Sequence, residues 1–280
     1  MGIGDLSWAA MYSLRSVDDW IGTINSNMGG TSRVGYKGTK TVFGGSGMSI
    51  DRAPAGALQG IQIADRTLTT QGTAIDFSQG AIVASTELTH FAIMGDGFFP
   101  VMDGGSRHGG GGNIFYTRDG EFHLTEEPAS PGSYVLMNSQ GMILTIPGAD
   151  PSAGNNHTPQ FNPAKAAQGF DIITGKYSDG TNITDCNATA WNIFRSIVTF
   201  PENQGLKFSK YGSTIFAPGT NTAYGPAFTG TATQQALEAS NASLTQSIPE
   251  LSLAQKMYSA LAKIFQTVNQ NTDTVINLIR

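Results

Sequence analysis

Charged side chains are scarce in this chain of 280 residues, where they make up 13% of the sequence. That is about half of the ~25% usual for soluble domains. Glycine and the uncharged polar residues Ser, Thr, Asn and Gln take their place. A surface of this kind is cheap to bury against another subunit, because few ions must lose their hydration. The composition therefore favours a subunit of an assembly, although a Thr- and Asn-rich β surface alone would give the same composition.

Basic residues are also too few for a nucleic-acid-binding protein. The chain has 16 Lys and Arg against 21 Asp and Glu, for a net charge of −5, whereas binding to nucleic acid needs a basic face. Cys186 is the only cysteine, which excludes an internal disulfide and a cysteine-based zinc site. A P-loop, a G-x-S-x-G nucleophile motif and an H-E-x-x-H motif are all missing, and the four histidines show no ligand spacing. We therefore predict no catalytic, cofactor-binding or metal-binding residues, and no enzyme.

Long hydrophobic runs are missing as well. No apolar stretch approaches the ~18 residues that a membrane-spanning helix needs. The N-terminus lacks the basic and apolar segments of a cleavable secretory signal, and the first Lys or Arg is Arg15. We expect no membrane insertion, and either a cytoplasmic protein or one exported by a route that reads an uncleaved N-terminus.

Both ends of the chain do carry apolar residues at alternating three- and four-residue intervals, the spacing of a coiled-coil stripe. At the N-terminus these residues are Ile3, Leu6, Ala10, Leu14, Val17, Ile21, Ile24 and Met28. At the C-terminus they are Leu237, Leu244, Ile248, Leu251, Tyr258, Leu261, Phe265, Val268, Val275 and Ile279. We interpret both sets as assembly helices, because an isolated helix with one apolar stripe is marginal in water until that stripe is covered.

The positions of proline and glycine predict where these helices begin and end. The first proline is Pro54, so the N-terminal helix is expected to run uninterrupted over residues 3–28 and to stop at Gly29 and Gly30. Pro249 lies inside the C-terminal stripe, where proline costs about 3 kcal/mol unless it sits in a first turn. We therefore expect either a short helix over 234–246 and a long one capped by Ser247, or one kinked helix.

The middle of the chain has the alternation and turn residues of short strands. Strands are predicted at 91–94, 98–102, 114–118, 122–124, 134–137, 142–146, 191–200 and 206–208. The predicted fold class is α+β: terminal helices form a coiled-coil-like domain (1–36 plus 234–280), with a mainly antiparallel β-domain between them. An extended linker region (37–75) precedes this β-rich outer domain (76–233), which contains an irregular insertion at about 148–190.

Four groups of segments carry a family resemblance. In chain order they are 25–28 with 35–37, 76–80, 91–99 with 116–122, and 236–241 with 254–258 and 276–278. Through them the sequence resembles the bacterial flagellar axial proteins, the rod and hook subunits, over nearly its whole length. The positions that match the family motifs are Asn25, Asn27, Gly35, Tyr36, Lys37, Phe77, Gly80, Gly95, Gly97, Phe98, Phe99, Tyr116, Arg118, Gly120, Glu238, Asn241 and Gln255.

This resemblance implies a structural subunit without catalysis. Family members leave the cytoplasm through the flagellar export apparatus without a cleaved signal, and they assemble helically into a tube in the basal body or hook, between periplasm and exterior. The expected partners are further copies of the chain, neighbouring rod and hook proteins and the export apparatus. The length of this chain favours a rod subunit over a hook subunit, because a hook subunit usually carries an additional outer domain. A more remote alternative is a trimeric phage-tail or adhesin-like β protein with helical ends.

Overall fold

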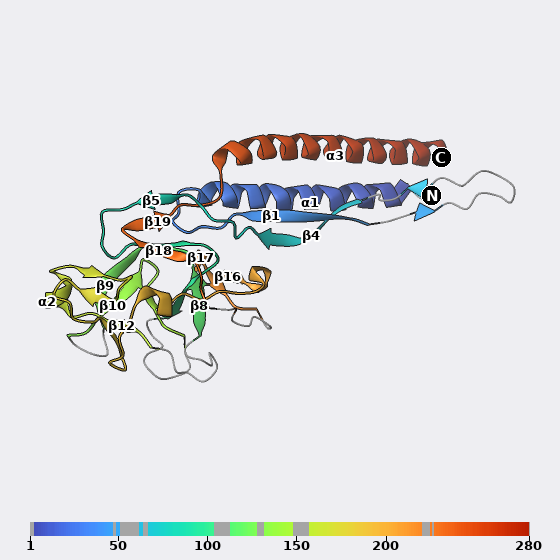
Figure 1. The fold of residues 1–280 in the computed structure, drawn as a ribbon. Helices are drawn as coiled ribbons and strands as arrows, with labels where there is room; N and C mark the ends of the chain where they lie inside the picture. Colours follow the sequence, from blue (N-terminus) through green and yellow to red (C-terminus); the bar gives the residue numbers. More distant parts are fainter. Residues whose placement is uncertain are drawn as a thin grey trace. The chain divides into compact units, whose positions relative to one another are not determined.

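The computed structural model describes residues 3–46, 49–50, 62–63, 67–103, 113–127, 132–147, 157–219, 225 and 227–279. In this part of the chain the fold is α+β, with an N-terminal helix, a mainly antiparallel β region and a C-terminal helix (Figure 1). The chain forms two compact units. We call them the helical unit (Met1–Gly29, Thr39–Asp76 and Ala242–Arg280) and the β unit (Gly30–Gly38 and Phe77–Asn241).

The helical unit consists of two long helices and a hairpin. Its elements are α1 (Ile3–Gly30), β1 (Thr39–Ser46), β2 (Ser49–Ile50), β3 (Gln62–Ile63), β4 (Thr67–Ile75) and α3 (Leu244–Ile279). The predicted N-terminal helix is confirmed, and it ends at the paired glycines as expected. The two helices pack through a small core of Val17, Ile24 and Ala254, with Trp20, Ile21, Met28, Leu68, Leu251, Met257 and Leu261 around it.

The hairpin of β1 and β4 packs beside α1. The two strands pair antiparallel from Thr39↔Ile75 to Ser46↔Thr67, with a register shift at Val42/Phe43. The backbone N–H of Leu68 donates to Ser13 Oγ at 3.0 Å, and that of Thr70 to Ser16 Oγ at 3.1 Å. These serines are buried in α1, so they give β4 hydrogen-bond partners that a bare helix surface could not provide.

The prediction of a helix over residues 234–246 is wrong. Thr231–Gln234 form β18, which pairs with β6 (Phe91–Met94). Ala236–Glu238 form β19, which pairs with β5 (Ile82–Ala84). Leu237 therefore lies in a strand and is not part of a terminal helix. Gln235, between the two strands, has φ of 56°, a left-handed conformation that no α-helix tolerates.

Of the two alternatives for Pro249, two helices or one kinked helix, the division into two helices is wrong. The helix α3 begins at Leu244 and continues through Pro249 to Ile279 as one element, so it is not divided at Ser247. Ser247 is a buried helical residue whose hydroxyl donates to Ser243 O at 3.0 Å, and it does not cap a helix. Pro249 sits close enough to the N-terminus that little of the hydrogen-bond ladder precedes it, which explains its tolerance.

The β unit is built on one seven-stranded sheet with the order β16-β17-β8-β7-β11-β10-β9, paired antiparallel throughout. Its strands are β7 (Phe99–Asp103), β8 (Ile114–Thr117), β9 (Phe122–Glu126), β10 (Tyr134–Asn138), β11 (Met142–Leu144), β16 (Lys207–Ser209) and β17 (Gly212–Ala217). The remaining elements are β5 (Ile82–Ala84), β6 (Phe91–Met94), β12 (Pro159–Gln160), α2 (Pro163–Ala166), β13 (Phe170–Asp171), β14 (Lys176–Tyr177), β15 (Thr184–Asp185), η2 (Ile193–Arg195), η3 (Asn203–Gly205), β18 (Thr231–Gln234) and β19 (Ala236–Glu238). The strands predicted between residues 91 and 146 are confirmed to within two residues at each end.

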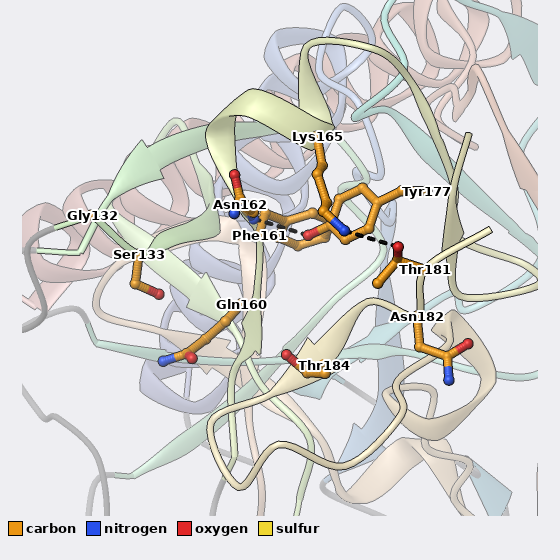
Figure 2. Close-up of a pocket in the computed structure, with 10 residues that line it drawn as sticks. All are labelled: Gly132, Ser133, Gln160, Phe161, Asn162, Lys165, Tyr177, Thr181, Asn182 and Thr184. Atoms are coloured by element: carbon orange, nitrogen blue, oxygen red, sulfur yellow. Dashed lines mark hydrogen bonds between the residues drawn. The ribbon is translucent and has the colours of Figure 1, made fainter. Parts of the chain in front are cut away.

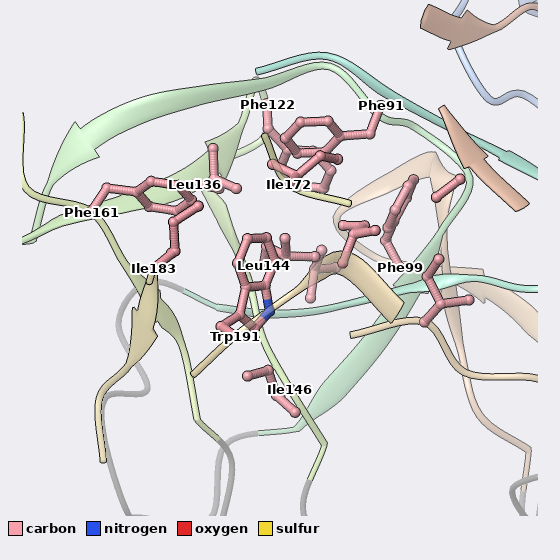
Figure 3. Packing of buried hydrophobic residues seen from close by; sticks show 14 of the residues in the cluster. Phe91, Phe99, Phe122, Leu136, Leu144, Ile146, Phe161, Ile172, Ile183 and Trp191 are labelled. Atoms are coloured by element: carbon pink, nitrogen blue, oxygen red, sulfur yellow. The ribbon is translucent and has the colours of Figure 1, made fainter. Parts of the chain in front are cut away.

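The strand predicted over residues 191–200 is wrong, because this segment folds as a 3₁₀ turn (η2) with irregular flanks. Asn192 caps η2 by accepting a hydrogen bond from the N–H of Arg195, and Trp191 Nε1 donates to Ser196 Oγ at 2.9 Å. The apolar residues Trp191, Ile193 and Ile197 are nevertheless buried in the main core of the β unit (Figure 3). The segment is apolar because it fills this core, and burial does not require a strand.

Candidate assembly surfaces and the motif cluster

The inner face of α3 differs from the predicted stripe. Of the predicted residues, Leu251 and Leu261 contact the α1 side, and Phe265 and Val268 are half-buried. Ala254, which is completely buried, and Met257 complete the contact; the sequence analysis missed both, although they lie three residues apart on the same face. On α1, Ala10, Leu14, Val17, Ile21, Ile24 and Met28 are all buried or half-buried, as predicted. The side chains of Ile3, Leu6 and Ile279 lie outside the described residues.

Large apolar side chains are also exposed on both helices. They are Trp8, Met11 and Tyr12 on α1, and Leu244, Ile248, Leu253, Tyr258, Ile264, Val275, Ile276 and Leu278 on α3. Four of the predicted stripe residues are in this set, so they do not contact α1. Exposed apolar surface of this extent on a helix marks an interaction site or an aggregation hazard.

Three exposed residues form a row along α3. Leu253, Ile264 and Val275 follow each other at intervals of eleven residues and have exposed fractions of 52%, 48% and 41%. Eleven residues are close to three helical turns, so the three side chains share one face of α3. We call them the α3 row. A row of this length is suited to lie along a helix of another subunit.

Several motif residues of the β unit meet around the carboxylate of Glu238 on β19. Its Oε1 accepts from Lys37 Nζ at 2.6 Å and from the backbone N–H of Gly80 at 2.8 Å, and its Oε2 accepts from Arg118 Nη1 at 3.1 Å. The three charged side chains are buried, with exposed fractions of 0% for Lys37, 2% for Arg118 and 1% for Glu238. We call Lys37, Gly80, Arg118, Glu238 and Asn241 the motif cluster.

Each of the two cations also donates a hydrogen bond to a backbone carbonyl. Lys37 donates to Ser78 O at 2.7 Å, and Arg118 donates to Gly95 O at 2.6 Å. The guanidinium also lies over the Phe98 ring, 5.0 Å from its centroid. Burial lowers the pKa of Arg118, and the Glu238 carboxylate opposes this shift. Two cations on one anion leave the cluster with an excess positive charge that these carbonyls and the ring help to stabilise.

Asn241 adds hydrogen bonds to the backbone of two other segments of the motif cluster. Its Oδ1 accepts from the N–H of Gly38 at 2.7 Å, and its Nδ2 donates to Ser78 O at 3.0 Å. The segments at residues 35–38, 78–80 and 238–241 are the parts of the β unit that lie next to its boundaries in the chain. The motif cluster thus connects, within the β unit, three of the four places where the chain enters or leaves it.

The remaining motif positions have separate structural roles. Asn27 bonds both backbone groups of Thr39 in the helical unit, at 2.7 and 2.8 Å. The rings of Phe77, Phe99 and Tyr116 make edge-on contacts in the β unit. Asn25 and Gln255 are exposed on α1 and α3 and do not join the cluster. The sequence analysis had named the charged members separately, without a signal that they meet.

Gly35 shows why the motif requires a glycine next to Tyr36. Its φ is +66°, and a Cβ at this position would overlap the backbone of Arg118 and Asp119.

We predict that Gly35→Ala destabilises the β unit by about 3 kcal/mol, through backbone strain and the displaced strand end. Gly212→Ala is the matched control, because its Cβ would find only Gln140 Cγ at 3.9 Å. Urea denaturation of both variants tests this; equal midpoints for the two would contradict it.

Asp119, next to the motif residue Arg118, was also missed. It is 3% exposed, its Oδ1 accepts from the N–H of Glu121 at 3.0 Å, and its own N–H donates to Thr117 Oγ1 at 2.9 Å. Burial raises the pKa of the Asp119 carboxyl to about 7. The backbone turn that the motif specifies therefore places an acid in a site that disfavours its charged form.

Within the described part of the chain, no group of three or more His, Cys, Asp or Glu side chains is arranged to hold a metal ion. No helix among these residues is long and apolar enough to cross a membrane.

Comparison with known proteins gives two kinds of match. The family model described as "Flagellar basal body rod FlgEFG protein C-terminal" matches residues 233–278, which include β19, most of α3 and the motif residue Glu238. The chain is similar to the flagellar basal-body rod protein FlgG of Bacillus subtilis (strain 168), with 25% identity over 291 residues that cover 98% of both chains. It is also similar to the protein of the same name from Buchnera aphidicola subsp. Baizongia pistaciae (strain Bp), with 24% identity over 280 residues, 94% of this chain and 95% of that one. Together with the motif residues, these matches confirm the resemblance of the chain to the bacterial flagellar rod and hook axial proteins.

Proposed function

We propose that this chain is a structural subunit of the flagellar rod, which assembles helically into a tube that transmits torque and through which exported subunits pass. The observation that carries this proposal is the similarity to two proteins named as basal-body rod proteins over at least 94% of their lengths and of this one. As a rod subunit it has no catalytic role, and it assembles with neighbouring rod and hook proteins. Its place is the basal body of the bacterial flagellum, reached through the export apparatus.

The helical unit supplies the assembly mechanism in this proposal. The two helices α1 and α3 pack through Val17, Ile24 and Ala254. The α3 row and the exposed residues of α1 remain available for further copies of the chain. Each side chain of this size contributes roughly 1.5–3 kcal/mol when it is fully buried. Contacts between different faces of successive copies build an open filament and not a closed ring.

The two alternatives differ in measurable ways. A hook subunit would be found in the hook, whereas the curated relatives carry the name of the rod. A phage-tail or adhesin-like protein would form a stable trimer, which sedimentation would detect as one species of fixed mass. A rod subunit is expected to be a monomer at low concentration and to polymerise as the concentration rises.

We predict that Leu253→Asp prevents polymerisation and abolishes motility while leaving the subunit folded. A charge in the α3 row cannot be buried against a neighbour without a large desolvation cost, yet Leu253 is already 52% exposed in the subunit. Sedimentation velocity, electron microscopy of concentrated protein and swimming in soft agar measure the effect. Ser252→Asp, an exposed neighbour on α3, adds the same charge as a control.

A second arm of the same experiment separates assembly from folding. Leu251→Asp places the charge against α1 and should lower helicity as well as polymerisation, with the thermal unfolding of the β unit unchanged. Polymers formed normally by Leu253→Asp would refute the role of the α3 row. Loss of the β unit's transition in Leu251→Asp would refute its independence from the helical unit.

A further inference from the structure

A cavity of about 500 Å³ lies in the β unit (Figure 2), and no residue of the motif cluster lines it. Its walls come from β12, β15, the start of α2, β14 and the turn before β10. We propose that this cavity binds an uncharged oligosaccharide. The size falls within the range of roughly 300–1,000 Å³ typical of small-molecule sites, and the proposal goes beyond the structural role in the rod.

The lining is rich in amides and hydroxyls that have hydrogen-bonding capacity to spare. Among the described residues, no protein group bonds the side chains of Gln160, Asn182 or Thr184, which all face this cavity. The Oγ atom of Ser133, which also lines the cavity, is buried and has no hydrogen-bond partner among the residues that the structure describes. Buried polar groups are normally paired, so an unpaired hydroxyl at the wall of a cavity indicates that something else supplies the partner.

Sugars match this mixture of groups. Each hydroxyl of a sugar both donates and accepts a hydrogen bond, and a primary amide offers a donor and an acceptor side by side. Phe161 and Tyr177 also line the cavity, but their rings are buried, with exposed fractions of 1% and 7%, so polar groups make up the accessible wall. The Tyr177 hydroxyl accepts from the N–H of Asn162 at 2.9 Å, so its own proton remains available to donate.

The charge of the lining argues for a neutral ligand. Lys165, the one charged residue that lines the cavity among those described, is paired with Asp179 at 3.0 Å and donates to Thr181 Oγ1 at 2.8 Å. Its ammonium also lies 5.8 Å from the centre of the Tyr177 ring. An ammonium that already has an ion pair, a hydrogen bond and a ring contact attracts a phosphate or a carboxylate only weakly.

The backbone segments that carry the binding groups are held by strand pairing and hydrogen bonds within the protein. Gln160 and Thr184 face each other as a β12–β15 pair, and the side chain of Asn162 caps α2 by accepting from the N–H of Ala164 at 3.0 Å. Asp185, next to Thr184, accepts from the N–H groups of Asn187 and Thr189. Groups held in place before binding lose less entropy when the ligand arrives.

Isothermal titration of the full-length chain with cellotetraose and with chitotetraose tests the proposal. We expect millimolar or tighter binding of at least one of them. Gln160→Ala and Asn182→Ala should each weaken it about tenfold, since each removes at least one hydrogen bond to the ligand. Gln168→Ala, which removes an exposed amide outside the cavity, should bind like the parent.

Two results would overturn the proposal. One is the absence of binding by both sugars at low-millimolar concentration, and the other is binding that the Gln160 and Asn182 variants leave unchanged. Thermal melting confirms that each variant is folded. Asn182 is exposed and its side chain bonds no described residue, so its variant keeps the test decisive if Gln160→Ala does not fold.

Discussion

Replacing Glu238 with Gln is expected to destabilise the β unit by about 3–5 kcal/mol, the cost typical of breaking a buried ion pair from one side. Gln has nearly the same shape and can still accept the hydrogen bond from the N–H of Gly80. It cannot compensate the charges of Lys37 and Arg118, which are 0% and 2% exposed. The variant therefore changes the charge and leaves the packing nearly intact.

The measurement is urea denaturation of the purified chain, followed through the aromatic signal of the β unit. Glu87→Gln is the matched control, since Glu87 belongs to the same unit and is exposed; we expect it to change the free energy of unfolding by less than about 0.5 kcal/mol. A loss below 1 kcal/mol in Glu238→Gln would show that the two cations find other partners or water.

A double-mutant cycle with Lys37→Met locates the interaction. If Glu238 and Lys37 act on each other directly, the double variant is expected to be less destabilised than the sum of the two single variants, by about 0.5–3 kcal/mol. Additive effects would instead assign most of the cost to Arg118, whose Nη1 bonds the other carboxylate oxygen at 3.1 Å.

The terminal helices could be predicted from the sequence because their cause is local. The stripe from Ala10 to Met28 follows helical periodicity without interruption, and the paired glycines end it. The exposed residues of α3 could not be assigned in this way. Ile248 and Tyr258 fit the coiled-coil interval as well as Leu251 does, and only the packing partner decides which residues face inward.

Strand β19 was missed for the opposite reason. Leu237 lies seven residues before Leu244, an interval that suits a helix, whereas the strand exists because β5 supplies its hydrogen-bond partners from residues far away in the chain. The motif cluster also depends on residues that are far apart in the chain. The family resemblance named Lys37, Arg118 and Glu238, but only the fold shows that side chains up to 201 positions apart share one carboxylate.

Asp119 is expected to make the stability of the β unit depend on pH near neutrality. The pKa of Asp119 is about 7 in the folded state, against the ordinary value of 3.8, so the folded state holds the proton more tightly than the unfolded chain does. The contribution of Asp119 to stability is fully present below its pKa in the unfolded chain, and it is lost as the pH rises through its pKa in the folded state. At about 1.4 kcal/mol for each pH unit between the two values, the loss amounts at most to on the order of 4 kcal/mol.

Asp119→Asn isolates this effect. Asn keeps the oxygen that accepts from the N–H of Glu121 and cannot ionise, so the variant should be more stable than the parent at pH 8 and similar to it at pH 4. The free energy of unfolding is measured in urea at several pH values, and the difference between variant and parent is compared at each pH, because groups that the two proteins share contribute equally to both. If the difference in the free energy of unfolding between the parent and Asp119→Asn stays constant from pH 4 to pH 8, the buried carboxyl is ionised throughout. The turn after Arg118 would then solvate the charge of Asp119 better than its burial implies.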